Sequence, residues 1–116
     1  MILELVEFDA PEGWGREQVM EDARKVFAKW QADADLRRKH FLLDETGKTI
    51  AGVYIWSSIE AAKRAHNAEW QQSVIQRTGG APRMRYFDLL ALVDNESGKV
   101  TEFPEAAFAP ATLQTD

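Results

Sequence analysis

The sequence predicts an α+β fold in which one four-stranded antiparallel sheet carries two helices on a single face. Four segments have the alternating apolar pattern or the β-rich composition of strands, two have the period of a helix, and their order is β-α-β-β-α-β. The chain has 116 residues, the usual length of one domain, and 45% of them are apolar, which is enough for a modest core. We therefore expect a single domain.

The chain begins with a strand and a helix. Ile2 to Phe8 alternates as a strand does, and segment 9–15 contains a proline and two glycines that end it. From Arg16 to Trp30 the apolar residues step by three, four and one along a single helical face. These patterns predict a strand over 2–8 and one continuous helix over 16–30.

Two β-rich runs follow and predict an antiparallel hairpin. They are Leu36 to Leu43 and Thr49 to Trp56, and the five residues between them contain Gly47. A second helix comes next: Ser57 and Glu60 have the spacing of a capping box at its start. Two glycines and a proline after Arg77 predict its end.

The last predicted strand runs from Arg83 to Val93, and a polar link leads to a short extra strand over Val100 to Phe103. Residues 104–116 contain two prolines and no clear period, so we expect an extended arm there. The single domain is thus expected to span residues 1–103. The element order is that of a ferredoxin-like protomer. Its strands carry apolar residues on both faces, which predicts that a second copy of the chain covers the face opposite the helices.

A symmetrical hairpin predicts which side chains share a face. If the strands pair about the middle of the link, the opposed residues are His40 with Gly52, Arg38 with Tyr54, and Leu36 with Trp56. One face of the hairpin then carries two basic and two aromatic side chains, namely Arg38, His40, Tyr54 and Trp56. Gly52 leaves space beside His40.

The second helix directs a histidine and a tryptophan toward the same region. At about 100° per residue the helix has one inward line, made of Ile59, Ala62, His66, Trp70 and Val74. An aromatic stripe and a single inward histidine are also what an ordinary core contains. Spacing alone therefore leaves two interpretations open, core packing and a ligand pocket.

Composition excludes several classes of function. A formal charge of −5 gives no electrostatic footprint for nucleic acid or an anionic membrane. With no cysteine and two histidines, the chain cannot form a thiolate or three-histidine metal centre by itself, and no glycine loop that would hold a phosphate opens a helix. We expect no metal, no other cofactor, no membrane segment and a cytoplasmic location.

The stretch "LRRKHFLLDETGKTIAGVYIWSSIEAAKRAH", with "RYFDLLALVDN" further on, resembles the YdhR-like mono-oxygenases of the dimeric α+β barrel superfamily, which includes the antibiotic-biosynthesis monooxygenases. The resemblance covers roughly residues 1 to 95 and implies a homodimer whose two sheets close a barrel. It also implies an aromatic substrate bound between sheet and helices and oxidised by molecular oxygen, in several relatives without metal, flavin or haem.

The resemblance extends to single residues. Trp56 and His66 match a tryptophan and a histidine of the haem-degrading branch, but the first strand lacks that branch's asparagine, so haem binding is not implied. In the quinone-forming branch an asparagine and a tryptophan one turn apart surround the substrate with a basic strand residue. His66 and Trp70 are here the pair one turn apart, and Arg85 is a loose match for the basic residue.

These observations favour a cofactor-independent monooxygenase acting on a small phenolic or polycyclic aromatic compound. His66 would take a proton from the substrate, and Arg85 or Arg38 would stabilise the anion. Trp56, Trp70 and Tyr54, with His40 beside them, would bind the ring. Two alternatives remain open: a homodimer that binds a small molecule without catalysis, and an isomerase or lyase on the same scaffold.

Overall fold

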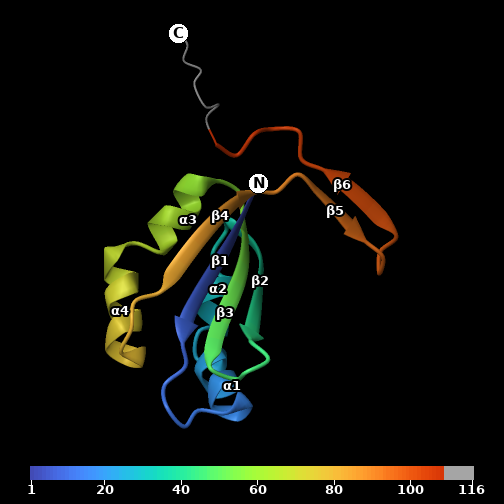
Figure 1. Ribbon diagram of the computed structural model, residues 1–116. Helices are drawn as coiled ribbons and strands as arrows, with labels where there is room; N and C mark the ends of the chain where they lie inside the picture. The colour runs from blue at the N-terminus through green and yellow to red at the C-terminus, as the bar shows by residue number, and fades with distance from the viewer. Residues whose placement is uncertain (109–116) are drawn as a thin grey trace.

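Four strands form the sheet of the computed structural model, which describes residues 1–108. β1 (Ile2–Asp9) and β3 (Thr49–Trp56) are central, while β2 (Leu36–Leu43) and β4 (Arg83–Asp88) are the edges, in the order β2-β3-β1-β4 (Figure 1). All neighbouring strands are antiparallel. The predicted α+β class and its four-stranded antiparallel sheet are confirmed.

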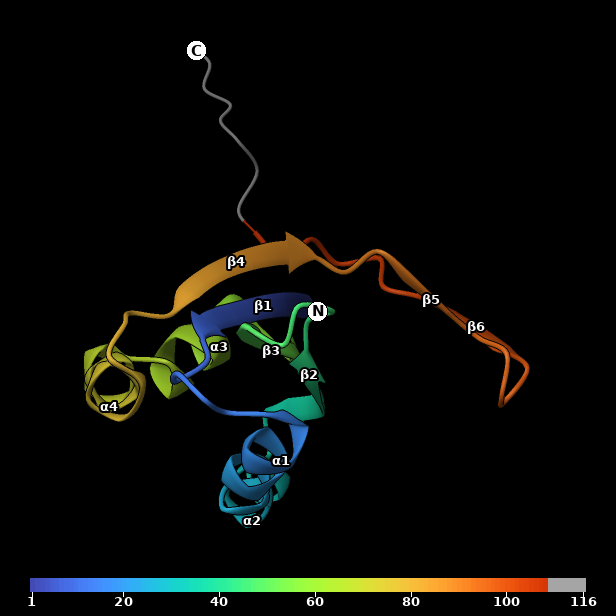
Figure 2. The same cartoon turned by 60° about the horizontal axis from the view of Figure 1, so that its bottom comes forward.

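The helices lie on one side of this sheet, as Figure 2 shows. Burial alternates along the two central strands, and every second residue faces the helices. The helix-facing residues of these strands are Ile2, Glu4, Val6 and Phe8 on β1, and Ile50, Gly52, Tyr54 and Trp56 on β3. The core lies between this face and the helices.

The predicted helix over 16–30 is wrong in one respect, because it is divided into α1 (Arg16–Arg24) and α2 (Phe27–Gln31). Val26 has φ −116° and ψ 5°, outside the helical region, and its N–H bonds to the carbonyl of Ala23 at 3.1 Å. The tightened turn changes the direction of the chain, and both segments still bury apolar residues.

The second predicted helix is also two helices, α3 (Ile59–Ala65) and α4 (Ala68–Thr78). His66 leaves the helical region at φ −108° and ψ 51°, and the Asn67 side chain accepts from the N–H of Trp70 at 2.9 Å to begin α4. The helix ends as predicted, with Gly79 in the left-handed region at φ 88°.

The predicted capping box at Ser57 is wrong by one residue. Ser58 is the residue that begins α3, and its Oγ accepts from the N–H of Ala61 at 3.1 Å. Ser57 instead bonds to Asp35, through its N–H to the carbonyl at 3.0 Å and through its hydroxyl to the carboxylate at 3.2 Å. These bonds tie the end of β3 to the segment that enters β2.

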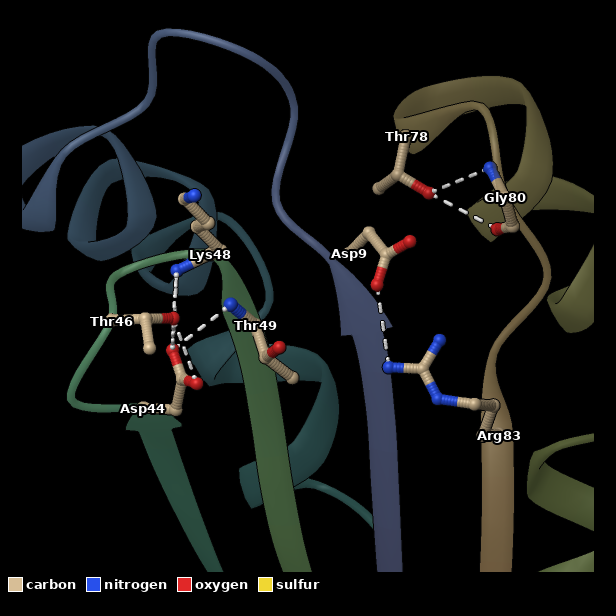
Figure 3. A network of polar contacts seen from close by, with 8 residues as sticks. All are labelled: Asp9, Asp44, Thr46, Lys48, Thr49, Thr78, Gly80 and Arg83. Atoms are coloured by element: carbon tan, nitrogen blue, oxygen red, sulfur yellow. Dashed lines mark hydrogen bonds and ion pairs between the residues drawn. The ribbon is translucent and has the colours of Figure 1, made fainter.

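The turn between β2 and β3 sets a register that differs from the predicted one. Asp44 and Thr49 close the turn through a backbone bond of 2.9 Å, and the Asp44 carboxylate accepts from Thr46, Lys48 and Thr49 (Figure 3). These bonds also hold the pKa of the Asp44 carboxyl below its usual value. The loop therefore has four residues, where the symmetrical pairing assumed five.

A one-residue change in register exchanges the two faces of a strand. Lys39 pairs with Tyr54 and Phe41 with Gly52, so these residues of β2 face the helices. Arg38 and His40 lie on the opposite face, contrary to the prediction. A bulge between Leu36 and Arg38 restores the predicted pairing of Leu36 with Trp56.

The predicted long strand over 83–93 is wrong, because the chain leaves the sheet after Asp88. β5 (Ala91–Asp94) pairs only with β6 (Lys99–Glu102), and this hairpin projects away from the sheet in both views (Figures 1 and 2). Two backbone bonds anchor its base, from Leu89 to Met1 at 3.0 Å and from Phe103 to Leu90 at 2.9 Å. The predicted arm over 104–116 lies partly outside the described residues.

The sheet face without helices is apolar at its centre, as the sequence predicts. Leu3, Leu5, Val53 and Ile55 are its half-buried residues on β1 and β3. Phe87 on the edge strand β4 is 38% exposed. We call this surface the open face.

Candidate functional site

A buried carboxylate lies at the centre of the core. Glu4 on β1 has no exposed surface, and one of its oxygens accepts from Trp56 Nε1 at 2.8 Å. Its two oxygens lie 2.8 and 2.9 Å from His66 Nδ1. Because a carboxylate accepts hydrogen bonds, Nδ1 carries the proton in this pair. The Glu4 side chain therefore fixes two of the residues that the sequence singled out.

Aromatic rings surround the His66 imidazole. Its centroid lies 4.0 Å from Trp70, 4.6 Å from Tyr54 and 5.4 Å from Trp30. Tyr54 also stacks on Trp56, with 5.8 Å between centroids and 6° between planes. The structure thus brings together His66, Trp56, Trp70 and Tyr54. His66 Nε2 is buried and has no hydrogen-bond partner among the described residues.

A cavity of about 220 Å³ lies beside this cluster, between the helix-facing side of the sheet and helices α1, α2 and α4. Tyr54, Trp30 and Trp70 line it, and the same three rings pack around His66. Neither His66 nor Trp56 is among the described residues that line the cavity. His66 is therefore separated from the cavity by a wall of aromatic rings.

Lys39 on β2 supplies an amine to the cavity wall. Its Nζ lies 3.8 Å from the ring centroid of Tyr54, 4.1 Å from that of Phe41 and 5.5 Å from that of Trp30. Gly52 makes room for it, because a Cβ at that position would lie 3.0 Å from Nζ and 3.0 Å from Tyr54 Cε1. The space predicted beside Gly52 is thus occupied by Lys39, where the sequence suggested His40.

The cavity environment changes the acidity of two of its groups. Burial lowers the pKa of the Lys39 ammonium to about 7, with the charge of Glu4 acting in the opposite direction and Lys29 adding a smaller decrease. Burial raises the pKa of the Tyr54 phenol well above its usual range, and the charge of Glu4 raises it further. At neutral pH the lysine can therefore exchange protons, and the tyrosine remains a neutral hydroxyl.

The remaining charged residues of the cavity are mostly cations. Lys25, Lys29 and Arg77 line it together with a single carboxylate, that of Asp22. Arg77 forms an ion pair with Asp22. In a chain whose net charge is −5, the lining of this cavity therefore carries a local excess of cationic side chains.

Three of the predicted site residues lie elsewhere. Arg85 on β4 pairs with Leu5 and is exposed on the open face, with its guanidinium 4.9 Å from the ring centroid of Phe87. Arg38 and His40 are exposed on the same side of the sheet because of the register change. The anion-stabilising role expected of Arg85 or Arg38 therefore has no support from their positions within one chain.

Glu4, Lys39 and Trp30 are the residues of this region that the sequence reasoning missed. Glu4 had a usable signal, since it shares strand parity with Ile2 and Val6 and so had to be buried. Trp30 was visible on the apolar face of the first helical segment. Lys39 could not be found without the turn geometry that sets the register.

Two absences apply to residues 1–108. No described cluster of histidine, aspartate and glutamate side chains has the arrangement needed to hold a metal ion. None of the helices in this range is long and apolar enough to cross a membrane.

The fold and the cavity define a class: a ferredoxin-like α+β domain with an aromatic pocket between its sheet and its helices. No family model and no curated protein sequence matches the chain. Among solved structures it is similar to a monooxygenase from the gene ActVA-Orf6 of Streptomyces coelicolor, which was crystallised with the ligand nanaomycin D. The TM-score is 0.58 at 14% identity, over 74% of this chain and 84% of that one. At this identity the similarity is one of fold alone.

Proposed function

We propose that this chain is a cofactor-independent monooxygenase that oxidises a small phenolic compound with molecular oxygen. The observation that carries the proposal is the aromatic cavity, which lies between the sheet and the helices of a fold shared with a solved monooxygenase. The wider family resemblance seen in the sequence, to the YdhR-like mono-oxygenases, supports the same reaction class. The fold by itself does not determine the function.

The cavity size limits the substrate. An engineered apolar cavity of about 150 Å³ holds a benzene molecule. A volume of about 220 Å³ in one chain therefore suits one substituted ring or a fused pair, and a larger polycycle would have to extend out of the cavity. Tyr54, Trp30 and Trp70 would pack against the ring and exclude water.

The proposed reaction begins with removal of a proton from the substrate. The resulting phenolate is electron-rich enough to pass an electron to oxygen, and the radical pair combines into a hydroperoxide on the ring. Loss of water from the hydroperoxide leaves one oxygen atom on the ring as a quinone carbonyl, so no further reductant is needed. His66 was predicted to be the base, and its unpartnered Nε2 is consistent with such a role. Because Tyr54 and Trp70 separate it from the cavity, direct transfer would require one of these rings to move.

We also propose that two copies pair through the open face. Its half-buried Leu5, Val53 and Ile55, together with the exposed Phe87, form an apolar surface that a second sheet would cover. Arg85, which lies on this face, would be placed at the interface between the two copies. This arrangement agrees with the dimeric barrel implied by the sequence resemblance.

Oxygen consumption tests the proposed reaction. Purified protein with a panel of dihydroxylated one-ring and two-ring aromatics should consume oxygen. Loss of this uptake in a His66→Ala protein that is still folded would assign the proton removal to His66. Uptake unchanged in His66→Ala would remove that residue from the chemistry. A protein that binds such compounds but consumes no oxygen would favour the second candidate function, a ligand-binding homodimer.

A specific observation favours that second candidate, namely that the predicted base does not line the cavity. An isomerase or lyase is the third possibility. Product analysis under nitrogen separates it from the proposed oxygenase, because an oxygenase stops without oxygen while an isomerase or lyase continues.

A further inference from the structure

We infer that Lys39 accepts the proton of an acidic aromatic hydroxyl bound in the cavity and remains beside the resulting phenolate as its counter-ion. In this step the O–H bond of the ligand breaks, an N–H bond forms on Nζ, and the electron pair stays on the phenolate oxygen. No oxidant takes part in the transfer. The inference rests on the proposed function for its substrate class and assigns to Lys39 the proton transfer that the sequence assigned to His66.

Position is the first argument. Lys39 Nζ lies over three ring faces of the cavity, those of Tyr54, Phe41 and Trp30, whereas Lys29 Nζ lies over Trp30, at 4.6 Å. Lys25 and Lys29 are exposed residues at the rim, and Arg77 is already paired with Asp22. A ligand ring packed on Tyr54 would therefore place a substituent next to Lys39 Nζ before it reached another cation.

The Lys39 amine has no strong hydrogen-bond partner within the protein. Aromatic faces attract an ammonium ion, but they are not hydrogen-bond acceptors of the strength of a carboxylate. Among the described residues Lys39 forms no ion pair and no side-chain hydrogen bond. Its protons and its lone pair are consequently available to a ligand.

The surrounding charges complete the account of how the amine titrates. Glu4 of β1 lies behind the rings and favours the ammonium, while Lys29 of α2 disfavours it. Tyr54 of β3 stays neutral, and the Asp22 and Arg77 charges of α1 and α4 compensate each other. Burial leaves the Lys39 pKa near 7, so a large fraction of the molecules carry a neutral amine at physiological pH. A phenolate placed beside it restores the preference for the ammonium.

His66 is the competing acceptor, and its contacts argue against it. Its Nδ1 is bound to Glu4, and its ring is enclosed by Tyr54, Trp70 and Trp30. Lys39 lines the cavity, whereas His66 Nε2 is buried and His66 does not line the cavity.

Calorimetry with para-nitrophenol tests the inference. At about pH 8 the free probe is a phenolate and most Lys39 is neutral, so binding should take up nearly one proton per probe as Lys39 becomes an ammonium. The uptake is obtained by comparing binding heats in buffers of different ionisation enthalpy. Lys39→Arg should bind the probe without uptake, since its guanidinium is already charged.

Lys39→Met should bind the probe about tenfold to a hundredfold more weakly, because the counter-ion is lost. Lys48→Met, which removes a lysine from the exposed end of the same hairpin, should behave like the wild type. Far-UV circular dichroism establishes that each variant is folded. If Lys39→Met fails to fold, the comparison of the wild type with Lys39→Arg decides the question alone.

Three results would overturn the inference: no probe binding by the wild type, wild-type binding without proton uptake, or proton uptake that persists in Lys39→Arg. Lys39-dependent uptake in a protein that consumes no oxygen with any phenol would instead refute the proposed monooxygenase and leave the role of Lys39 intact.

Discussion

Replacing Lys39 with methionine tests how strongly the fold opposes a charge in its cavity. In the folded chain burial lowers the Lys39 pKa from its ordinary 10.5 to about 7. Between these values the unfolded chain binds a proton that the folded chain releases. The free energy of unfolding of the wild type should therefore rise with pH through this window, since the unfolded state carries more protons.

The size of the effect follows from the same two values. Each pH unit inside the window adds about 1.4 kcal/mol, less near pH 7, where half of the folded molecules are protonated. From about pH 7 to about pH 9 this linkage amounts to about 2 kcal/mol. The part of the side chain that touches solvent reduces the penalty, so we expect a change of about 1–2 kcal/mol. Lys39→Met lacks the titrating group and should show none of it.

Urea unfolding at several pH values measures this difference. The quantity of interest is the stability of Lys39→Met minus that of the wild type at one protein concentration, because the other titrating groups then cancel. The variant should be the more stable protein near pH 7, and its advantage should shrink as the pH rises. An advantage that stays constant from about pH 7 to about pH 9 would show that Lys39 titrates normally and would refute the reasoning.

Three further substitutions test other parts of the structure. Glu4→Gln weakens the acceptor of two buried donors and should lower the free energy of unfolding by roughly 2–4 kcal/mol. The control Glu45→Gln, at an exposed position, should change it little. Equal effects of the two substitutions in urea unfolding would contradict the buried network. Gly52→Ala places a Cβ 3.0 Å from both Lys39 Nζ and Tyr54 Cε1, so it should lower the free energy of unfolding by about 1–3 kcal/mol and weaken para-nitrophenol binding. Gly80→Ala, which has open space around it, should change neither quantity. Ile55→Asp on the open face should convert a dimer into a monomer in light scattering, and an unchanged mass would exclude this face as the interface.

Periodicity in the sequence was sufficient to predict the order of the four sheet strands along the chain. β2 and β3 begin and end at the predicted residues, and in β3 the alternation of β-branched and aromatic side chains matches alternating burial. The helix breaks at Val26 and His66 were not predictable in this way. At His66 the cause is tertiary, since its side chain bonds to a glutamate 62 residues earlier in the chain. Helical periodicity contains no information about such a partner.

The residues of the candidate site also differ in how well the sequence predicted their positions. His66, Trp56, Trp70 and Tyr54 were expected to come together, and they do. Tyr54 and Trp56 follow from the alternation of β3, while His66 and Trp70 meet across the break between α3 and α4. Arg38 and His40 were expected beside them and lie on the other side of the sheet, because their placement depended on the length of one turn.

A crystal structure of the protein with para-nitrophenol is the most direct test of the account. Such a structure would show whether an aromatic hydroxyl binds in the cavity between the sheet and the helices with its oxygen at Lys39. We expect the ring to pack against Tyr54, Trp30 or Trp70 and the phenolic oxygen to lie within hydrogen-bond distance of Lys39 Nζ. A probe bound elsewhere, or bound in the cavity with its oxygen directed away from Lys39, would contradict it.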